Sequence, residues 1–138
     1  MSNTAEVEVH NNEQLARFVL FRRWVRPAGT IKPDAFIPPS DLNLSVTRHA
    51  ALSHEQLWAR GRSVAELRGK PLYGRADVSV NSVRRTKLDA IRHPVDGNPE
   101  HAHIVEWPTD KPTQKSIAQQ LADLAQYMPV DDSHTNST

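Results

Sequence analysis

The sequence predicts one small α+β domain, in which a mixed or antiparallel sheet is covered by two main helices. Three observations support this prediction. The chain has 138 residues, the usual size of a single domain. Several short segments alternate apolar and polar residues, as half-buried strands do. Two longer segments carry apolar residues at helical spacing, one ending near residue 68 and one running to residue 128.

The folded part is predicted to span residues 13–128. Residues 1–12 and 129–138 lack a sustained apolar pattern and are predicted to be flexible tails. No apolar run approaches the roughly 18 residues that cross a membrane, so we expect no membrane partner. The polar, acidic start is unlike a secretory signal. The absence of cysteine excludes disulfides, thiolate chemistry and Fe–S clusters. These features together predict a soluble, cytoplasmic protein.

Strands are expected where alternation or strand-forming residues dominate. In Leu44–Arg48 two apolar residues alternate with serine and threonine, and Leu72–Val80 has one apolar and one polar face. The first apolar segment, Gln14–Val25, fits either helix or strand, and we assign strand to its Phe18–Val25 end. The other predicted extended segments are Thr30–Phe36, Leu88–Arg92 and His101–Trp107.

The clearest helix start is Ser53, because a glutamine three residues later completes a capping box. Gly61 costs about 1 kcal/mol relative to alanine inside that helix, and Gly69 supplies a stop after it. Residues after Asn81 are predicted to form a short helical turn. In the final helix one apolar stripe is predicted, consisting of Ile117, Leu121, Leu124 and Met128.

Charge is distributed unevenly along the chain. The net charge is −3 over residues 1–13, +9 over residues 14–92 and −5 over residues 93–138. Twelve of the seventeen cations are arginine, whose planar fork suits phosphate and carboxylate groups. Two interpretations remain open. The basic segment forms an open face for an anionic or acidic partner, or the acidic C-terminal part folds back and neutralises it.

Several cations are candidates for an anion-binding or nucleic-acid-binding surface. Phe21 and Trp24 lie between some of them, as in surfaces that combine phosphate contacts with base stacking. For Arg75, on the Leu72–Val80 strand, an ion pair with Asp77 is the alternative role. These candidates are Arg22, Arg23, Arg75, Arg84, Arg85 and Lys87.

His101 and His103 are the sharpest candidate site. On a strand their side chains point to the same face about 7 Å apart, a spacing that suits a shared metal or phosphate. A metal needs further ligands, for which the candidates are His49, His93, Glu100 and Asp77. No second motif fixes any of these, so we predict neither a metal nor a cofactor. A structural role for both histidines is the alternative.

Arg48 and His49 lie where a predicted strand ends just before the capped helix. Backbone N–H groups at helix N-termini favour anions, which makes the pair a candidate catalytic or binding site. A surface ion pair is the alternative.

Familiar nucleotide-binding, hydrolase and nucleic-acid-binding motifs are absent from the sequence. The segments LNLSVTRHAALSHEQLW, GRADV and GNPEHAHIVEWP, with the Ala/Leu-rich final helix, resemble a group of small uncharacterised prokaryotic proteins. The shared features are an LSV strand, a serine-capped helix and an NP-x-His-Ala loop. The resemblance covers most of residues 15–126. It implies a single prokaryotic cytoplasmic domain and no particular activity.

Two functions follow from these residues. The first is a non-enzymatic binding or accessory module, whose arginine-rich face meets a protein partner, an anionic ligand or nucleic acid. The second is a small phosphoryl-transfer, hydrolase or nuclease-like enzyme that uses His101 and His103 with Arg48 or His49. The enzyme requires these four side chains and Arg75 to converge in one pocket, whereas the binding module does not.

Overall fold

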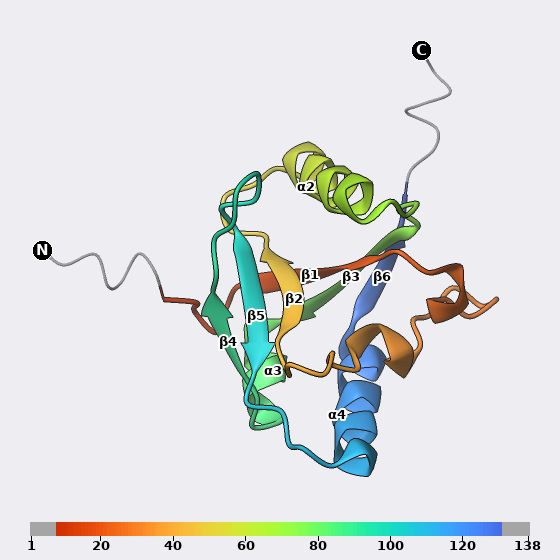
Figure 1. Ribbon diagram of the computed structural model, residues 1–138, viewed down its shortest axis with the longest axis vertical. Helices are drawn as coiled ribbons and strands as arrows, with labels where there is room; N and C mark the ends of the chain where they lie inside the picture. Colours follow the sequence, from red (N-terminus) through yellow and green to blue (C-terminus); the bar gives the residue numbers. More distant parts are fainter. Residues whose placement is uncertain (1–7, 131–138) are drawn as a thin grey trace, which may run out of the picture.

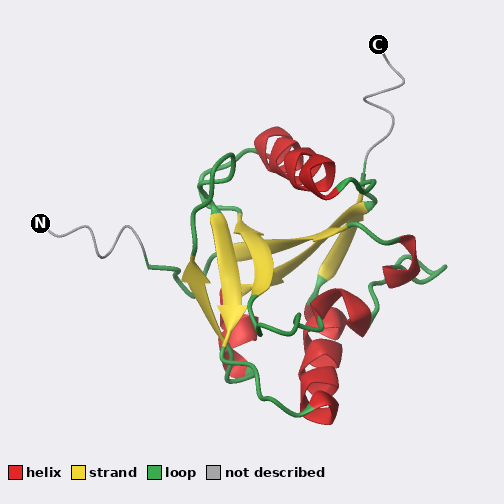
Figure 2. Cartoon of the chain, viewed as in Figure 1, coloured by secondary structure: helices red, strands yellow, loops and turns green. Residues whose placement is uncertain are grey.

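Six antiparallel strands form one sheet in the order β4-β5-β2-β1-β3-β6 (Figures 1 and 2). The computed structural model describes residues 8–130. This arrangement confirms the predicted α+β class and shows that the sheet is antiparallel. The strands are β1 (Gln14–Val19), β2 (Leu44–Arg48), β3 (Gly74–Ser79), β4 (Asp89–Arg92), β5 (His101–Val105) and β6 (Gln126–Pro129).

Helices cover both faces of the sheet, as Figure 1 shows. Helix α2 (His54–Arg68) lies on one face, over a small core of Ala16, Phe18, Leu20, Leu57 and Ala65. The larger core fills the opposite face, where three elements pack against the sheet. These are the 3-10 turn η2 (Pro33–Phe36) and the helices α3 (Val80–Arg85) and α4 (Lys111–Leu124).

The predicted start and end of α2 are confirmed. Ser53 Oγ accepts from the Gln56 N–H at 3.1 Å, and Gln56 Oε1 accepts from the Ser53 N–H at 2.9 Å. Gly69 adopts a left-handed conformation after the last turn. Packing explains the glycine at position 61, because a Cβ there would lie 2.7 Å from the Phe18 ring. Without a Cβ at this position, α2 can approach β1 closely.

The first apolar segment differs from the prediction. Strand β1 ends at Val19, and the chain then forms the 3-10 turn η1 (Arg22–Trp24) instead of continuing as a strand to Val25. Both faces of β1 are covered, so its apolar residues do not alternate with exposed ones. The predicted extended segment Thr30–Phe36 contributes only one bridge, between Val25 and Ile31, before η2 begins. Proline at the first position of η2 has the backbone angle that a helical turn needs.

The predicted apolar and polar faces of Leu72–Val80 are present in the shorter strand β3, but both are largely buried. Five of the six residues of β3 are buried, because the face that carries Arg75 and Asp77 lies under α2. An alternating pattern indicates which residues share a face, but it does not indicate whether that face meets solvent. The packing of α2 on one face and of the larger core on the other decided this outcome.

The final helix is shorter than its apolar pattern predicts. It ends at Leu124, and Met128 belongs instead to β6, which pairs with β3. Leu124 is 62% exposed, whereas Ile117 and Leu121 are buried as predicted. In a longer helix, the backbone N–H and C=O groups after Leu124 would be hydrogen-bonded within the helix. Here they are hydrogen-bonded by pairing with β3.

The folded part begins before residue 13. Val9 is 4% exposed and belongs to the larger core, while the Asn11 carbonyl accepts from the Asn81 N–H at 3.0 Å. At the other end, Pro129 lies within β6 and the Val130 N–H donates to the Tyr73 carbonyl at 3.0 Å. The rest of the two predicted tails lies outside the described residues. No helix within residues 8–130 is long and apolar enough to cross a membrane.

Leu121 and Leu124 provide a matched test of the α4 packing. Leu121→Ala removes a side chain that is 0% exposed, so we expect a loss of about 2–5 kcal/mol in the free energy of unfolding. Leu124→Ala on the same helix should change it by less than about 0.5 kcal/mol. Urea unfolding of both variants measures the difference. Equal losses would contradict the orientation of α4 described above.

Candidate functional site

A cavity of about 190 Å³ lies between α2 and the sheet, and it is the candidate binding site. Its walls come from four parts of the chain that are far apart in sequence. The floor is β2, and the remaining walls are the end of β1 with η1, one side of α2 and the loop before β5. The contributing residues are Arg17, Phe18, Leu20, Phe21, Trp24, Ser45, Val46, Thr47, Ser63, Val64, Leu67, Arg68, Val95, Asp96, Gly97, Asn98 and His101.

Arg17 lies where β1 and β2 separate. The two strands form only two residue pairs, Leu15 with Arg48 and Ala16 with Thr47, whereas β1 and β3 form six. Beyond these pairs the Arg17 side chain takes the place of strand pairing. Its Nη1 donates to the Ser45 carbonyl at 3.0 Å and its Nε to the Ala35 carbonyl at 2.7 Å. The guanidinium thus bridges β1, β2 and η2 beside the cavity.

Arg17 is a cation without a carboxylate partner within residues 8–130. Its guanidinium lies 5.3 Å from the centre of the Trp24 ring. Burial, with a contribution from the positive charge of Arg68, lowers the pKa of Arg17 to about 10. Both effects disfavour the charged form, and the opposite charge of an anion in the cavity would offset them. Arg17 and Arg68 both line the cavity.

Apolar and polar side chains together give the cavity an amphipathic character. Leu67 is 82% exposed and Val95 is 41% exposed, although both line the cavity. Asn98 is 4% exposed, and its Nδ2 donates to Thr47 Oγ1 at 2.9 Å. The Asn98 Oδ1 is buried with no hydrogen-bond partner among the described residues. An unpaired buried acceptor favours a ligand that carries an N–H or O–H group.

Aromatic and cationic side chains continue the site along η1. The Phe21 and Trp24 rings, both in the cavity wall, lie 4.8 Å apart. The Arg23 guanidinium lies 4.7 Å from the centre of the Phe21 ring, and the Lys70 ammonium lies 5.0 Å from it. Of the cations proposed from the sequence, Arg23 therefore lies beside the cavity wall.

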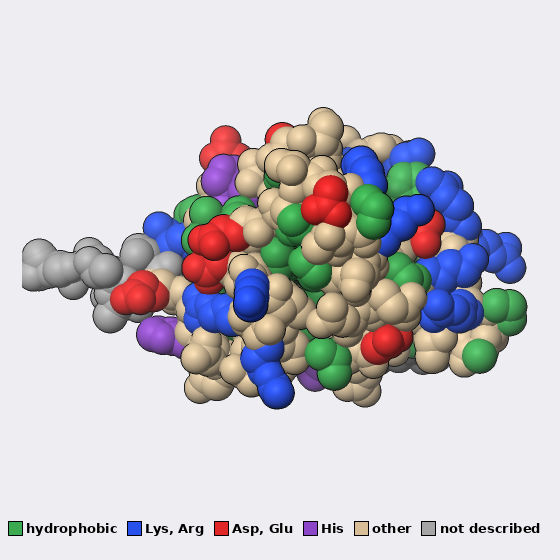
Figure 3. All heavy atoms as spheres, turned by 90° about the horizontal axis from the view of Figure 1, so that it is seen from below, with side chains coloured by type: hydrophobic (Ala, Val, Ile, Leu, Met, Phe, Trp, Pro, Cys, Tyr) green, Lys and Arg blue, Asp and Glu red, His purple; other side chains and the backbone are tan. Residues whose placement is uncertain are grey.

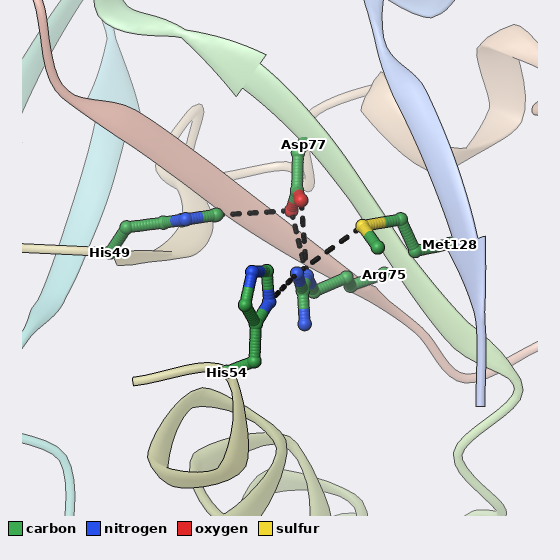
Figure 4. A network of polar contacts seen from close by, with 5 residues as sticks. All are labelled: His49, His54, Arg75, Asp77 and Met128. Carbon is green, nitrogen blue, oxygen red and sulfur yellow. Dashed lines mark hydrogen bonds and ion pairs between the residues drawn. The ribbon is translucent and has the colours of Figure 1, made fainter. Parts of the chain in front are cut away.

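A second polar group lies under α2 and is enclosed (Figure 4). Asp77 accepts from Arg75 Nε at 3.0 Å and from His49 Nε2 at 3.2 Å. Arg75 Nη2 donates to His54 Nδ1 at 2.8 Å and contacts the Met128 sulfur at 3.3 Å. The Arg75 side chain has no exposed surface, so the alternative internal ion pair is present and Arg75 offers no surface to nucleic acid.

The third group is a cluster of histidines at the β4–β5 edge. His101 and His103 lie on the same face of β5, as predicted, and His93 reaches them from the end of β4. The rings of His101 and His103 have centres 5.0 Å apart, and those of His93 and His103 are stacked at 4.2 Å. Burial is the main reason that the pKa values of His101 and His103 lie below the ordinary value, and the neighbouring histidines add to it.

Arg48 has a structural partner. Its Nε and Nη2 each donate to the Glu13 carboxylate at 2.8 Å, and Nη2 also contacts the Glu8 carbonyl at 3.3 Å. Burial opposes ionisation of Glu13, but the bonds from Arg48 and the His10 N–H outweigh it and hold the pKa below 4.5. Arg48 therefore joins β2 to the segment before β1, and it does not line the cavity.

The remaining predicted cations are divided between different parts of the surface. Arg84 on α3 donates to Asp89 at 2.8 Å and to Asn11 at 2.7 Å, on the sheet face opposite α2. Arg85 and Lys87 are exposed near it, whereas Arg22 and Arg23 are exposed at η1. In Figure 3 many Lys and Arg side chains gather toward the side where η1 and η2 lie in Figure 1. The basic segment does not form one continuous face. Up to residue 130, the acidic C-terminal part supplies one ion-pair partner, Glu100 for Arg60.

The five residues that the enzyme hypothesis requires do not converge. His49 and Arg75 share Asp77, Arg48 pairs with Glu13, and of the five only His101 lines the cavity. Sequence reasoning missed Arg17, the central cation of the cavity. The one available signal was a charged residue inside a run of strand-forming apolar residues. His93 was considered as a ligand, but no pattern linked it to the other two histidines.

Searches of protein-family models, curated proteins and solved structures found no match to this chain.

The Arg48–Glu13 pair predicts a specific pH dependence of stability. Because the folded state lowers the pKa of Glu13, the stabilisation is present above pH 4.5 and is lost as the pH falls through the lowered value. Glu13→Gln should reduce the free energy of unfolding by about 1–2 kcal/mol at pH 7, since two charge-assisted bonds weaken. The difference from the wild type should shrink as the pH falls below 4.5.

Chemical unfolding at pH 7 and at pH 3.5 measures this effect. Glu66→Gln, at an exposed position on α2, serves as the control and should match the wild type at both values. A loss for Glu13→Gln that is the same at both pH values would contradict the prediction.

The enclosed Arg75–Asp77 pair predicts a strong asymmetry between single and double variants. Asp77→Ala leaves the buried Arg75 charge without its carboxylate and should cost about 3–5 kcal/mol of unfolding free energy. Replacing both residues, Arg75→Met with Asp77→Leu, should restore much of that loss. Urea unfolding of the three proteins gives the comparison. A cost below about 1 kcal/mol for Asp77→Ala would mean that Arg75 reaches solvent.

Proposed function

We propose that this domain is a binding module for a small anionic molecule with an apolar body, held in the cavity under α2. The observation that carries the proposal is Arg17, a cation beside an apolar cavity with no carboxylate partner among the described residues. Arg17 is half-buried, and its hydrogen bonds go to neutral carbonyls, so its charge has little water and no countercharge to stabilise it. A ligand carboxylate or phosphate would supply the missing countercharge.

The walls of the cavity define the rest of the ligand. Phe18, Phe21 and Trp24 offer aromatic surfaces for a flat apolar body. The unpaired Asn98 Oδ1 favours a ligand with an N–H or O–H group. The volume of about 190 Å³ is below the roughly 300–1,000 Å³ of typical drug-sized pockets, so it suits a compact molecule such as an aromatic acid.

The arrangement of the candidates favours binding over the enzyme alternative. General acid–base chemistry requires its groups within hydrogen-bonding reach of one substrate. His101 is the one predicted catalytic residue in the cavity wall, while Arg48 and His49 are engaged by carboxylates elsewhere. Nucleic acid is a different partner that the same cations could attract, and the experiment below separates it from a small ligand.

Placing opposite charges at Leu67 tests the proposal. Its side chain is 82% exposed and lines the cavity, so substitution should leave the fold intact. Leu67→Glu should weaken binding of an anion and Leu67→Lys should strengthen it. At low salt their dissociation constants should differ by about three- to ten-fold, a gap that salt screening narrows.

The probes are 4-hydroxybenzoate, indole-3-acetate and phenyl phosphate, each paired with its neutral amide or alcohol, measured by ligand-observed NMR and calorimetry. We expect the anions to bind and the neutral analogues to respond equally to both Leu67 variants. Failure of every probe to bind, or equal affinity of both variants for the anions, would overturn the proposal. Binding of a single-stranded oligonucleotide with no small-anion binding would identify nucleic acid instead.

A further inference from the structure

The β4–β5 edge brings together three imidazole side chains from two segments of the chain. His93 follows β4, and His101 and His103 lie on β5 with one residue between them. The His93 N–H donates to the His101 carbonyl at 2.8 Å, which fixes the two backbones side by side. One ring nitrogen from each histidine lies within 4.8 Å of the others.

We propose that His93, His101 and His103 bind a divalent transition-metal ion, with Zn²⁺ as the reference ion. Zinc sites with three protein ligands keep a fourth position open for water or another molecule. Zinc–nitrogen distances of about 2.0–2.1 Å in a tetrahedral site bring ligand nitrogens within about 3.3–3.4 Å of one another. The three nitrogens identified above lie up to 4.8 Å apart, so the side chains must move closer together to reach that separation.

The backbone orients His101 as a ligand. Its Nδ1 lies 2.8 Å from the His93 carbonyl, so the ring donates its Nδ1–H there and presents the Nε2 lone pair. Metal-binding histidines commonly donate their second ring N–H to a carbonyl or carboxylate, which fixes the tautomer. This hydrogen bond exists without any ion and is a preorganising contact of that kind.

The chemistry of the cluster selects nitrogen-preferring metals. Among the described residues no aspartate or glutamate belongs to the group, whereas Ca²⁺ and Mg²⁺ require oxygen ligands. Imidazole suits zinc, copper, iron and nickel. A phosphate would require protonated imidazoles instead.

One rearrangement is needed before all three rings face a single ion. The His93 and His103 rings are stacked with an interplanar angle of 26°, so their in-plane lone pairs run nearly side by side. His93 is exposed and can turn about its side-chain bonds without displacing the core. His101 and His103 remain fixed on β5 while His93 closes the site.

The proposed metal site adjoins the cavity through His101, which belongs to both. The inference does not rest on the proposed anion binding, because it uses only the three histidines. If both are correct, an ion with an open coordination position would lie near the anion, and the two ligands would affect each other's affinity.

The test uses the full chain without a histidine tag, treated with a chelator and then titrated with Zn²⁺. Native mass spectrometry should show one Zn²⁺ per chain, and calorimetry should give its affinity. His101→Gln and His103→Gln should each weaken binding by more than the roughly 10–100-fold that the loss of an outer-shell partner costs. His10→Gln, at an exposed position away from the cluster, is the matched control and should bind like the wild type.

Two further measurements keep the result interpretable. Co²⁺ in place of Zn²⁺ should give the intense visible absorption of a tetrahedral site, and long-range ¹H–¹⁵N NMR should show that His101 keeps its Nδ1–H. Thermal melting of the metal-free variants shows whether they fold. Absence of Zn²⁺ binding by the wild type, or unchanged binding in folded His101→Gln and His103→Gln, overturns the inference. The anion titrations are repeated in the presence of a chelator. Anion binding measured without metal tests the anion proposal independently of the metal proposal.

Discussion

Coverage of both faces of the sheet is the constraint on which the rest of the structure depends. With α2 on one side and α3, α4 and η2 on the other, the central strands β1, β2 and β3 have little access to solvent. A polar side chain on these strands must find a partner inside the protein or lose the hydrogen bonds that water would supply. Arg75 meets this requirement in part, through Asp77 and His54, while its Nη1 has no partner among the described residues. Thr47 meets it with Asn98.

Arg17 meets the same constraint in a different way. Its two donors satisfy carbonyls at the point where β1 leaves β2, so it replaces hydrogen bonds that strand pairing would have made. No acidic side chain within residues 8–130 forms an ion pair with it, although Asp96 also lines the cavity. The separation of the two strands creates the space beneath α2, and the cation needed to bridge that separation gives the space its preference for anions. The cavity and its charge therefore have one structural origin.

The loop between β4 and β5 connects the two candidate ligand sites. It contributes Val95 and Asn98 to the cavity, and its ends carry His93 and His101. A ligand that orders this loop would change the positions of groups in both sites. The enclosed Arg75–Asp77 group lies apart from this loop and is best understood as a means of satisfying buried polar atoms.

The sequence determined the features that depend on neighbouring residues. The Ser53–Gln56 capping box, the left-handed Gly69, strand β2 and the placement of His101 and His103 on one face could all be predicted, because each depends on local hydrogen bonds or on the period of a strand. The resemblance to a prokaryotic group and the cytoplasmic location stay predictions.

Only the tertiary structure decided which faces were buried and which distant side chains met. Alternation along β3 could not show that its polar face lies under α2, and the apolar stripe of α4 could not show that Met128 leaves the helix to pair in β6. In the sequence, Arg17 is one of twelve arginines. It becomes the cation of a cavity because strand separation, a 3-10 turn and a helix from other parts of the chain surround it. Such contacts between distant segments leave no periodic pattern in the sequence, and that is why local reasoning could not find them.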